Sequence, residues 1–244
     1  MPADLSPSDI AKRATARRAA DLVETGMKVG LGTGSTAAFL VSRLGERLRD
    51  EGLRFTAVPT STRTAEQARG EGIEVVTLNE AGRLDLTIDG ADEFDADLTL
   101  IKGGGGAHLQ EKIVAAASDR MVVIADAGKE VATLGAFPLP VEVIPFGWRT
   151  TQALVARTLE NMDVDGGETV LRMRDGAAFV TDEGNHILDL HLGRIGDARA
   201  LSAALNHVPG VVENGLFIDI CDSVVIGHED GSVSLRGRLA AEQG

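Results

Sequence analysis

The sequence predicts an α/β protein whose larger domain is built on a parallel β-sheet. Short apolar runs alternate with segments of helical spacing along the first half of the chain. Several of these runs are continuous, which is typical of strands covered by helices on both faces. Polar or glycine-rich segments follow three of the runs, at 30–36, 89–95 and 102–106. We expect all three at the carboxyl edge of one sheet, where open α/β sheets bind ligands.

The elements of the first half are predicted from caps, apolar runs and glycines. Ser6 and Pro7 form a helix-start signal, because a Ser cap followed by proline suits a first turn, and Gly26 ends that helix. The expected helices cover 7–24, 37–49, 62–69 and 108–118, and the expected strands 27–31, 54–58, 74–78, 84–88, 98–101 and 121–125.

The pattern changes after about Leu134. The segment 137–146 carries three prolines, and short strand-like runs then alternate with two helical segments. This order indicates a small α+β unit with an antiparallel sheet. We predict a large domain of residues 1–134 and 211–244 and a small domain of residues 135–210. The later elements are expected as helices at 149–160 and 197–206 and strands at 169–174, 178–181, 186–192 and within 212–226.

Composition bounds the class of protein and its partners. The 244 residues are 43% hydrophobic and 25% charged, which is ordinary for a globular protein. The net charge of −13 makes nucleic acid an unfavourable partner, although local donors can still hold a small phosphorylated substrate. The single cysteine, Cys221, is expected in the core and excludes a disulfide within the chain. We expect a cytoplasmic protein with no membrane span or signal peptide.

The segment 30–36, GLGTGST, is expected to turn a strand into a helix. Amides at a helix N-terminus together with the hydroxyls of Thr33 to Thr36 suit an anion. A dinucleotide fingerprint would need glycine at the position of Ser35, and a methyltransferase-type loop would need an acid where Lys28 and Val29 stand. A plain tight turn is the remaining alternative.

The segment 89–95, DGADEFD, follows the expected strand 84–88. Asp89 and Asp92 bracket a Gly-Ala turn, so their carboxylates can accept hydrogen bonds from sugar hydroxyls. The four aspartates at 89–97 lack the spacing of a calcium loop, and we expect no metal. A solvated acidic turn is the alternative.

The segment 101–112, IKGGGGAHLQEK, is the most informative. Lys102 can hold an oxyanion, and Glu111 can act as a general base in the first turns of a helix. Four consecutive glycines, Gly103 to Gly106, let the backbone approach a substrate closely. A glycine linker with an exposed helix start is the alternative, and His108 is interpreted as structural. Lys129, after the strand 121–125, is a second candidate cation.

Seven motifs in order give the chain a family resemblance. They are GLGTGST (30–36), DGADE (89–93), IKGGGG with EKIV (101–114), IADAGK (124–129), FPLPVEVIPFGW (137–148), GNHILDL (184–190) and PGVVENGLF (209–217). With them the chain resembles the type A ribose-5-phosphate isomerases over nearly its whole length. His108 and Gln110 depart from the commonest pattern, which has Leu and Arg there.

The resemblance implies an activity and a set of site residues. The reaction is the interconversion of ribose 5-phosphate and ribulose 5-phosphate, in the non-oxidative pentose phosphate branch, through an enediolate and without metal or cofactor. Glu111 would move the proton between C2 and C1, and Lys102 would stabilise the enediolate oxygen. Asp89 and Asp92 would bind hydroxyls, and one can assist ring opening. The substrate site would be completed by Thr33, Gly34, Ser35, Thr36, Gly90, Ala91, Gly103, Gly104, Gly105 and Lys129.

The resemblance also implies a fold and an assembly: a Rossmann-like large domain, a ferredoxin-like small domain, and a homodimer or sometimes a tetramer. Two other classes stay open. A non-catalytic sugar-phosphate sensor would usually carry a DNA-binding helical module, for which there is no room because the first strand starts by Met27. A related sugar-phosphate deaminase or acyl-CoA transferase would reveal itself by ammonia release or CoA dependence.

Overall fold

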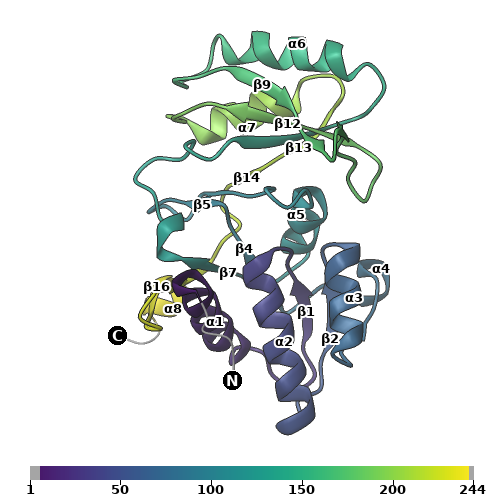
Figure 1. Cartoon of the computed structure of the whole chain (residues 1–244), viewed down its shortest axis with the longest axis vertical. Coiled ribbons are helices and arrows are strands. Elements are labelled where there is room, and N and C mark those ends of the chain that lie inside the picture. Colours follow the sequence, from purple (N-terminus) through teal and green to yellow (C-terminus); the bar gives the residue numbers. More distant parts are fainter. Residues whose placement is uncertain (1–5, 242–244) are drawn as a thin grey trace. The chain divides into compact units, whose positions relative to one another are not determined.

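The computed structural model describes residues 6–241, whose elements are drawn in Figure 1. Contacts divide the described chain into two compact units. The first contains residues 6–91, 110–129 and 219–241, and the second contains residues 92–109 and 130–218. This grouping places residues 92–109 in the second unit, whereas the sequence analysis predicted that they belong to the large domain. Because compactness alone does not show which parts fold independently, the predicted domain limits remain a prediction.

A seven-stranded sheet forms the centre of the first unit, in the order β16-β15-β7-β4-β1-β2-β3. Neighbouring strands are parallel except for β15 and β16, so the predicted α/β class with a parallel sheet is confirmed. The strands are β1 (Lys28–Leu31), β2 (Thr56–Pro59), β3 (Glu74–Val75), β4 (Leu86–Gly90), β7 (Met121–Asp126), β15 (Ser223–Gly227) and β16 (Val233–Gly237).

The strand order creates a switch point between β1 and β4. From β1 the chain moves outward through β2 to β3, and it then returns to pair β4 on the other side of β1. Loops that follow β1 and β4 therefore leave the sheet side by side, which is where open α/β sheets form ligand sites. The segment 30–36 contains the first of these loops, and Asp89 and Gly90 end β4 just before the second.

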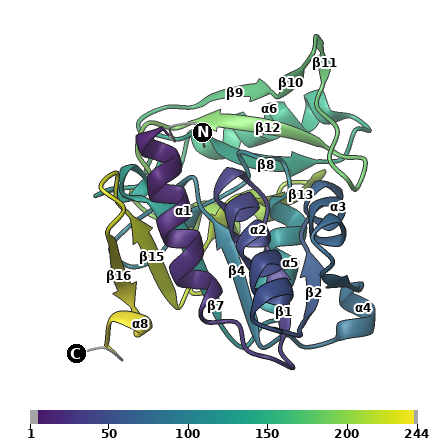
Figure 2. The ribbon, with the colours of Figure 1, turned by 60° about the horizontal axis from the view of Figure 1, so that its bottom comes forward.

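Helices cover the sheet of the first unit through two apolar clusters. One cluster joins the strands to α1 (Pro7–Ala20), α2 (Ser35–Asp50) and α3 (Thr62–Gly70), and Figure 2 shows α1 and α2 running alongside each other. A second cluster contains Leu84 with residues of α4 (Leu78–Ala81) and α5 (His108–Ala116). Helix α5 begins in residues of the second unit and continues in the first. A 3₁₀ turn, η1 (Ala127–Lys129), follows β7, and α8 (Arg238–Ala241) follows β16.

The second unit contains a four-stranded antiparallel sheet in the order β13-β8-β12-β9. Along the chain its elements run β-α-β-β-α-β, which is the ferredoxin-like arrangement that the resemblance implied. They are β8 (Leu139–Val143), α6 (Trp148–Leu159), β9 (Glu168–Leu171), β12 (His186–His191), α7 (Ala198–Asn206) and β13 (Val211–Asn214). The unit also has a hairpin, β10 (Met173–Arg174) with β11 (Ala177–Ala178), and a three-stranded sheet of β5 (Glu93–Phe94), β6 (Leu100–Ile101) and β14 (Leu216–Phe217).

Three predictions about elements were wrong. The strand before the glycine run, β6, pairs antiparallel with β5 and β14, so the run 103–106 does not follow a strand of the parallel sheet. The expected strand 74–78 ends at Val75, because Thr77 and Glu80 form a capping box that starts α4. The first helix ends at Ala20 instead of Glu24. Strand β8 was not predicted because its segment is rich in proline.

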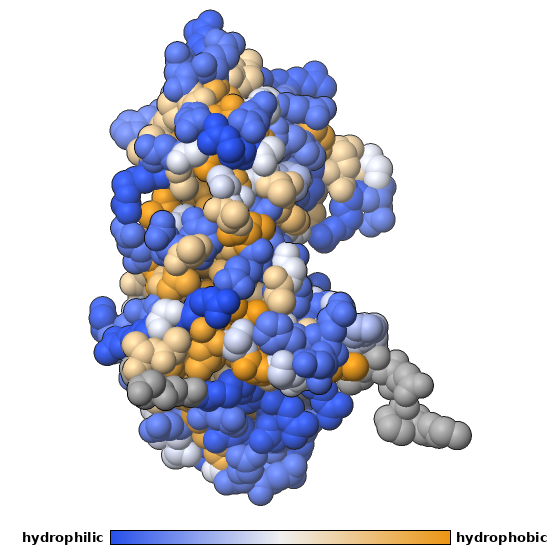
Figure 3. Space-filling model, turned by 90° about the vertical axis from the view of Figure 1, so that its left-hand side faces the viewer, coloured by the Kyte–Doolittle hydropathy of each residue, from blue (hydrophilic) through white to orange (hydrophobic). Residues whose placement is uncertain are grey.

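The surface mixes polar and apolar residues. On the face drawn in Figure 3, hydrophilic residues are interspersed with smaller hydrophobic areas, as is usual for folded proteins. Within residues 6–241, no helix combines the length and apolar character needed to cross a bilayer.

Candidate functional site

The loop 30–36 joins β1 to α2 and presents backbone donors at the helix start. Gly34 is the N-cap residue with φ +132°, a conformation that favours glycine. The first N–H groups of a helix have no partner within the helix, and Gly34 has no side chain to accept from them. Ser35 is exposed and begins α2. This geometry supports the anion loop that the sequence predicted.

Asp89, at the end of β4, holds the same loop in place. Its side chain is fully buried, and Oδ1 accepts hydrogen bonds from the amides of Thr33 (3.1 Å) and Gly90 (2.7 Å). A Cβ at Gly32 would lie 1.9 Å from that oxygen, so only glycine fits there. The structure thus brings together Thr33, Asp89 and Gly90, three of the predicted site residues.

The loop 30–36 contacts a cluster of hydroxyl side chains that the sequence analysis did not predict. Thr33 Oγ1 lies 2.8 Å from Thr60 Oγ1, 2.8 Å from Ser61 Oγ and 3.3 Å from Thr64 Oγ1. These residues follow β2, the neighbour of β1 in the sheet. The signal was available, since 59–64 reads PTSTRT, a run of hydroxyl residues after a strand.

Helix α5 carries Glu111 in its first turn, and the side chain is only 4% exposed. The helix packs closely on the sheet at Gly30, where a Cβ would lie 2.1 Å from Thr87 Oγ1 and 2.6 Å from Val114 Cγ1. Gly30 therefore sets how near α5 approaches β1 and β4. Lys129, half-buried in η1, follows β7, which pairs with β4, so it lies at the sheet edge where the sequence placed it.

Lys102 is a buried cation in the second unit. It follows β6, is 2% exposed, and its amide donates to the carbonyl of Gly215 at 2.9 Å. Its Nζ lies 5.4 Å from the centre of the Phe217 ring, within the range of a cation–π contact. A lysine removed from water in this way suits a developing negative charge.

The glycine run is a tightly packed turn, which overturns the linker alternative. Gly103 has φ +110°, and a Cβ there would lie 2.8 Å from Nδ1 of His108. Gly106 has φ +82°, and a Cβ would lie 2.4 Å from the Phe179 ring. The amide of Gly104 donates to Asp92 Oδ2 at 2.7 Å, so the run also orients that carboxylate.

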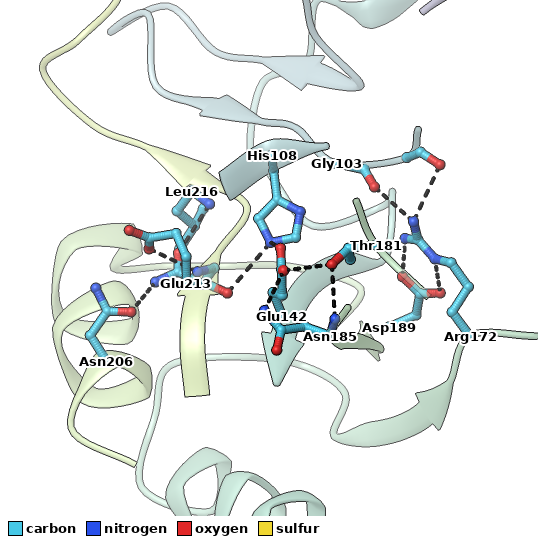
Figure 4. Close-up of polar contacts among 12 residues, drawn as sticks. Gly103, His108, Glu142, Arg172, Thr181, Asn185, Asp189, Asn206, Glu213 and Leu216 are labelled. Carbon is cyan, nitrogen blue, oxygen red and sulfur yellow. Dashed lines mark hydrogen bonds and ion pairs between the residues drawn. The ribbon is translucent and has the colours of Figure 1, made fainter. Parts of the chain in front are cut away.

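Side chains from the antiparallel sheet surround the glycine run, and sequence analysis missed them. Arg172 pairs with Asp189 and donates to the carbonyls of the run (Figure 4). His108 is fully buried, and its Nε2 lies 4.0 Å from Oε2 of Glu142. Burial raises the pKa of the Glu142 carboxyl. Glu142 and Asp189 lie within the motifs 137–148 and 184–190, but no role was predicted for them, and Arg172 lies in no motif. His108 stood out only as a departure from the family pattern.

Glu142 and Glu93 are buried acids with structural partners. Oε1 of Glu142 accepts from Thr181 Oγ1 and Asn185 Nδ2, both at 2.9 Å. Glu93, inside the DGADE motif, accepts from the amides of Gly135 (2.7 Å) and Phe137 (2.5 Å). Across residues 6–241, no three His, Cys, Asp or Glu side chains gather in a way that could hold a metal ion.

Comparison with known proteins identifies the family. The model described as "Ribose 5-phosphate isomerase A (phosphoriboisomerase A)" matches residues 56–231. The chain belongs to this isomerase family. A ribose-5-phosphate isomerase A from Cereibacter sphaeroides is 72% identical over 236 residues, covering 97% of this chain and 90% of the relative. The resemblance stated from the sequence motifs is therefore confirmed.

Solved isomerase structures share the fold over nearly the full chain. Ribose 5-phosphate isomerase A from Methanocaldococcus jannaschii matches with a TM-score of 0.86 and 40% identity, covering 96% of this chain and 100% of the other. A D-ribose-5-phosphate isomerase in complex with phospho-erythronic acid matches with a TM-score of 0.87 and 35% identity, covering 95% and 99%. Each identity is high enough to support the family as well as the fold.

Proposed function

We propose that this chain interconverts ribose 5-phosphate and ribulose 5-phosphate through an enediolate, with Glu111 as the base. The reaction moves one proton between adjacent carbons, C2 and C1, so one carboxylate on one face of the substrate suffices. The observation that carries the proposal is a 4% exposed carboxylate in the first turn of α5, in a chain of an isomerase family. Removal of a carboxylate from water raises its basicity toward a carbon acid.

Lys102 would stabilise the oxygen that gains negative charge as the enediolate forms. Buried cations act strongly there because little water screens them, and they are in place before the reaction begins. The hydrogen bond from the Lys102 backbone N–H to the Gly215 carbonyl fixes the backbone, and the contact with the Phe217 ring restricts where the Lys102 ammonium can lie.

The remaining predicted residues would bind the substrate. The amides and hydroxyls of Thr33 to Thr36 at the start of α2 suit the phosphate, and Lys129 adds a cation. Asp89 and Asp92 would accept hydrogen bonds from sugar hydroxyls, and one would assist ring opening. The backbone of Gly90, Ala91, Gly103, Gly104 and Gly105 would line the substrate. The ligand named for one related structure, phospho-erythronic acid, is itself a phosphorylated sugar acid, which agrees with this class of substrate.

The family resemblance further suggests a cytoplasmic homodimer with no nucleic-acid partner and no cofactor. The net charge of −13 supports the absence of a nucleic-acid partner. Sedimentation of the purified chain would test the dimer.

The decisive experiment measures ketose formation from ribose 5-phosphate in the presence of EDTA. Glu111→Gln should lower kcat by about 10²–10⁴-fold, the usual contribution of a general base, while substrate still binds. Glu66→Gln is the matched control, because Glu66 is an exposed glutamate of α3, and it should keep wild-type activity.

Other outcomes would redirect the proposal. Binding without turnover by the wild type would favour a sugar-phosphate sensor. Ammonia release from an amino-sugar phosphate, or dependence on CoA, would favour a related enzyme. If Glu111→Gln keeps most of the activity, the chain is still an isomerase, but another residue acts as the base.

A further inference from the structure

Arg172 and Asp189 form an ion pair with both side chains mostly buried. Arg172 follows β9, and Asp189 lies on β12, the strand next to β9. Arg172 Nε and Nη2 donate to the two carboxylate oxygens at 2.9 and 2.5 Å, and the side chains are 14% and 18% exposed. A two-point contact of this kind fixes the plane of the guanidinium group.

The remaining terminal nitrogen of Arg172 reaches the glycine run. Nη1 donates to the carbonyl of Gly103 at 2.8 Å and to that of Gly104 at 3.3 Å, as Figure 4 shows. The carbonyl of Gly103 also accepts from the amide of Gly106 at 3.0 Å. Glycine loses more backbone freedom on folding than any other residue, so this run needs bonds of this kind to hold one conformation.

The bond to Gly103 fixes the peptide unit that contacts Asp92. The carbonyl of Gly103 and the N–H of Gly104 belong to the same planar peptide group. Arg172 holds the carbonyl end at 2.8 Å, and Asp92 Oδ2 accepts from the N–H end at 2.7 Å. Rotation of this plane would move the N–H of Gly104 and with it the carboxylate of Asp92.

Phe179, the residue after β11, lies beside Arg172. The guanidinium lies 5.9 Å from the centre of the Phe179 ring, and the same ring occupies the space that a side chain at Gly106 would need. Arg172 and Phe179 therefore hold the two ends of the glycine run together.

We infer that Arg172 is a positioning residue for the isomerisation: held by Asp189, it orients the Gly103–Gly104 peptide and through it Asp92. The inference rests on the proposed function, because its importance for turnover depends on Asp92 acting on the substrate. Arg172 itself is assigned no contact with the substrate. Loss of Arg172 should therefore lower kcat, and it should also lower stability, because Asp189 would keep a largely buried charge without its partner.

The test compares three substitutions with a matched control. Arg172→Met keeps an unbranched stem and removes the donors. Arg172→Lys keeps the positive charge but loses the planar guanidinium group. Asp189→Asn removes the charge that pairs with Arg172. Arg194→Met is the control, because Arg194 pairs with Asp163 and Asp165 in the same unit through partly exposed side chains. kcat, KM, thermal midpoint and hydrogen exchange of the amides of residues 103–107 are measured for each.

Arg172→Met should lower kcat by about 10²-fold, the scale of a misplacement near 1 Å, with a smaller change in KM. Exchange at 103–107 should rise at the same time. Arg172→Lys and Asp189→Asn should lie between Arg172→Met and wild type, and Arg194→Met should match wild type in kcat and exchange. In a further variant, Arg172→Ala, added methylguanidinium should partly restore kcat, because it can replace the lost donors.

Unchanged kcat and unchanged exchange in Arg172→Met would overturn the inference, as would a loss of kcat in Arg172→Met and Arg194→Met alike. If Arg172→Met does not fold, Arg172→Lys and Asp189→Asn decide by the same two readouts. Lack of turnover by the wild type would refute the proposed function alone, since the exchange measurement would still show whether Arg172 orders the glycine run.

Discussion

Two glycine-rich loops of this chain are held in place by different means. The loop 30–36 is part of the parallel sheet: Gly32 donates to the carbonyl of Ile88 at 2.9 Å, and its missing side chain makes room for Asp89. The run 103–106 follows a strand of two residues and is held by side chains from other elements, chiefly Arg172 and Asp92. The first loop should therefore be sensitive to added volume, and the second to the loss or movement of single side chains.

Gly32→Ala should have the largest effect on both stability and activity. The added Cβ would lie 1.9 Å from Asp89 Oδ1 and 2.6 Å from the Asp89 Cα, so rotation of a side chain cannot relieve the clash. Overpacking of this kind costs about 1–3 kcal/mol or more, and displacement of Asp89 should abolish most turnover. Urea unfolding and kcat would be measured beside Gly70→Ala, where an added Cβ meets nothing within 4 Å. If Gly32→Ala is as stable as Gly70→Ala, the first loop is not held by close packing against Asp89.

Gly104→Ala should reduce activity more than stability. Its Cβ would lie 2.6 Å from Asp92 Oδ1, the end of a side chain that can rotate away. It would also lie 3.0 Å from Cζ of the Phe137 ring. We expect a thermal midpoint within a few degrees of wild type and a kcat lower by about 10²-fold, because Asp92 is displaced. A large loss of stability with normal turnover in the folded fraction would show that the two loops respond alike.

Glu142→Gln should have the smallest effect, a change in how stability depends on pH. Burial raises the pKa of Glu142 in the folded chain above its ordinary value of 4.5, so the folded state binds more protons than the unfolded state between the two pKa values. Its contribution is thus favourable at low pH and is lost as the pH rises through the folded pKa. Among the ionisable groups around Glu142, His108 lies 4.0 Å away, and the negative charges of Glu183 and Glu213 raise the Glu142 pKa further.

Unfolding by urea at a series of pH values from 4 upward would test this sign. The wild type should lose stability relative to Glu142→Gln as the pH rises, since glutamine keeps the shape without the proton. Glu160→Gln serves as the control, because Glu160 is exposed and is not among the charges that shift the pKa of Glu142. A pH profile of Glu142→Gln parallel to that of wild type would mean that Glu142 has the same pKa in both states.

Much of the fold was predictable because its signals are local. Continuous apolar runs marked β1, β4 and β7, and the Ser6-Pro7 signal marked the start of α1. The partner strands of β6 were not predictable, since β5 and β14 contribute only two residues each. Strand β8 was hidden by prolines, although it pairs on both sides with β12 and β13.

The sequence by itself determined where the candidate residues stand: glycines beside Lys102, a pair of aspartates around Gly90-Ala91, and Glu111 near the start of a helix. Residue type and short spacing suffice for that, because caps, turns and strand ends depend on neighbours along the chain. Only the tertiary structure decided what holds the glycine run, since Arg172 stands 69 positions from Gly103 and 17 from Asp189. Hydrogen bonds between such distant segments depend on how strands pair and side chains pack, and no local pattern in the sequence encodes them.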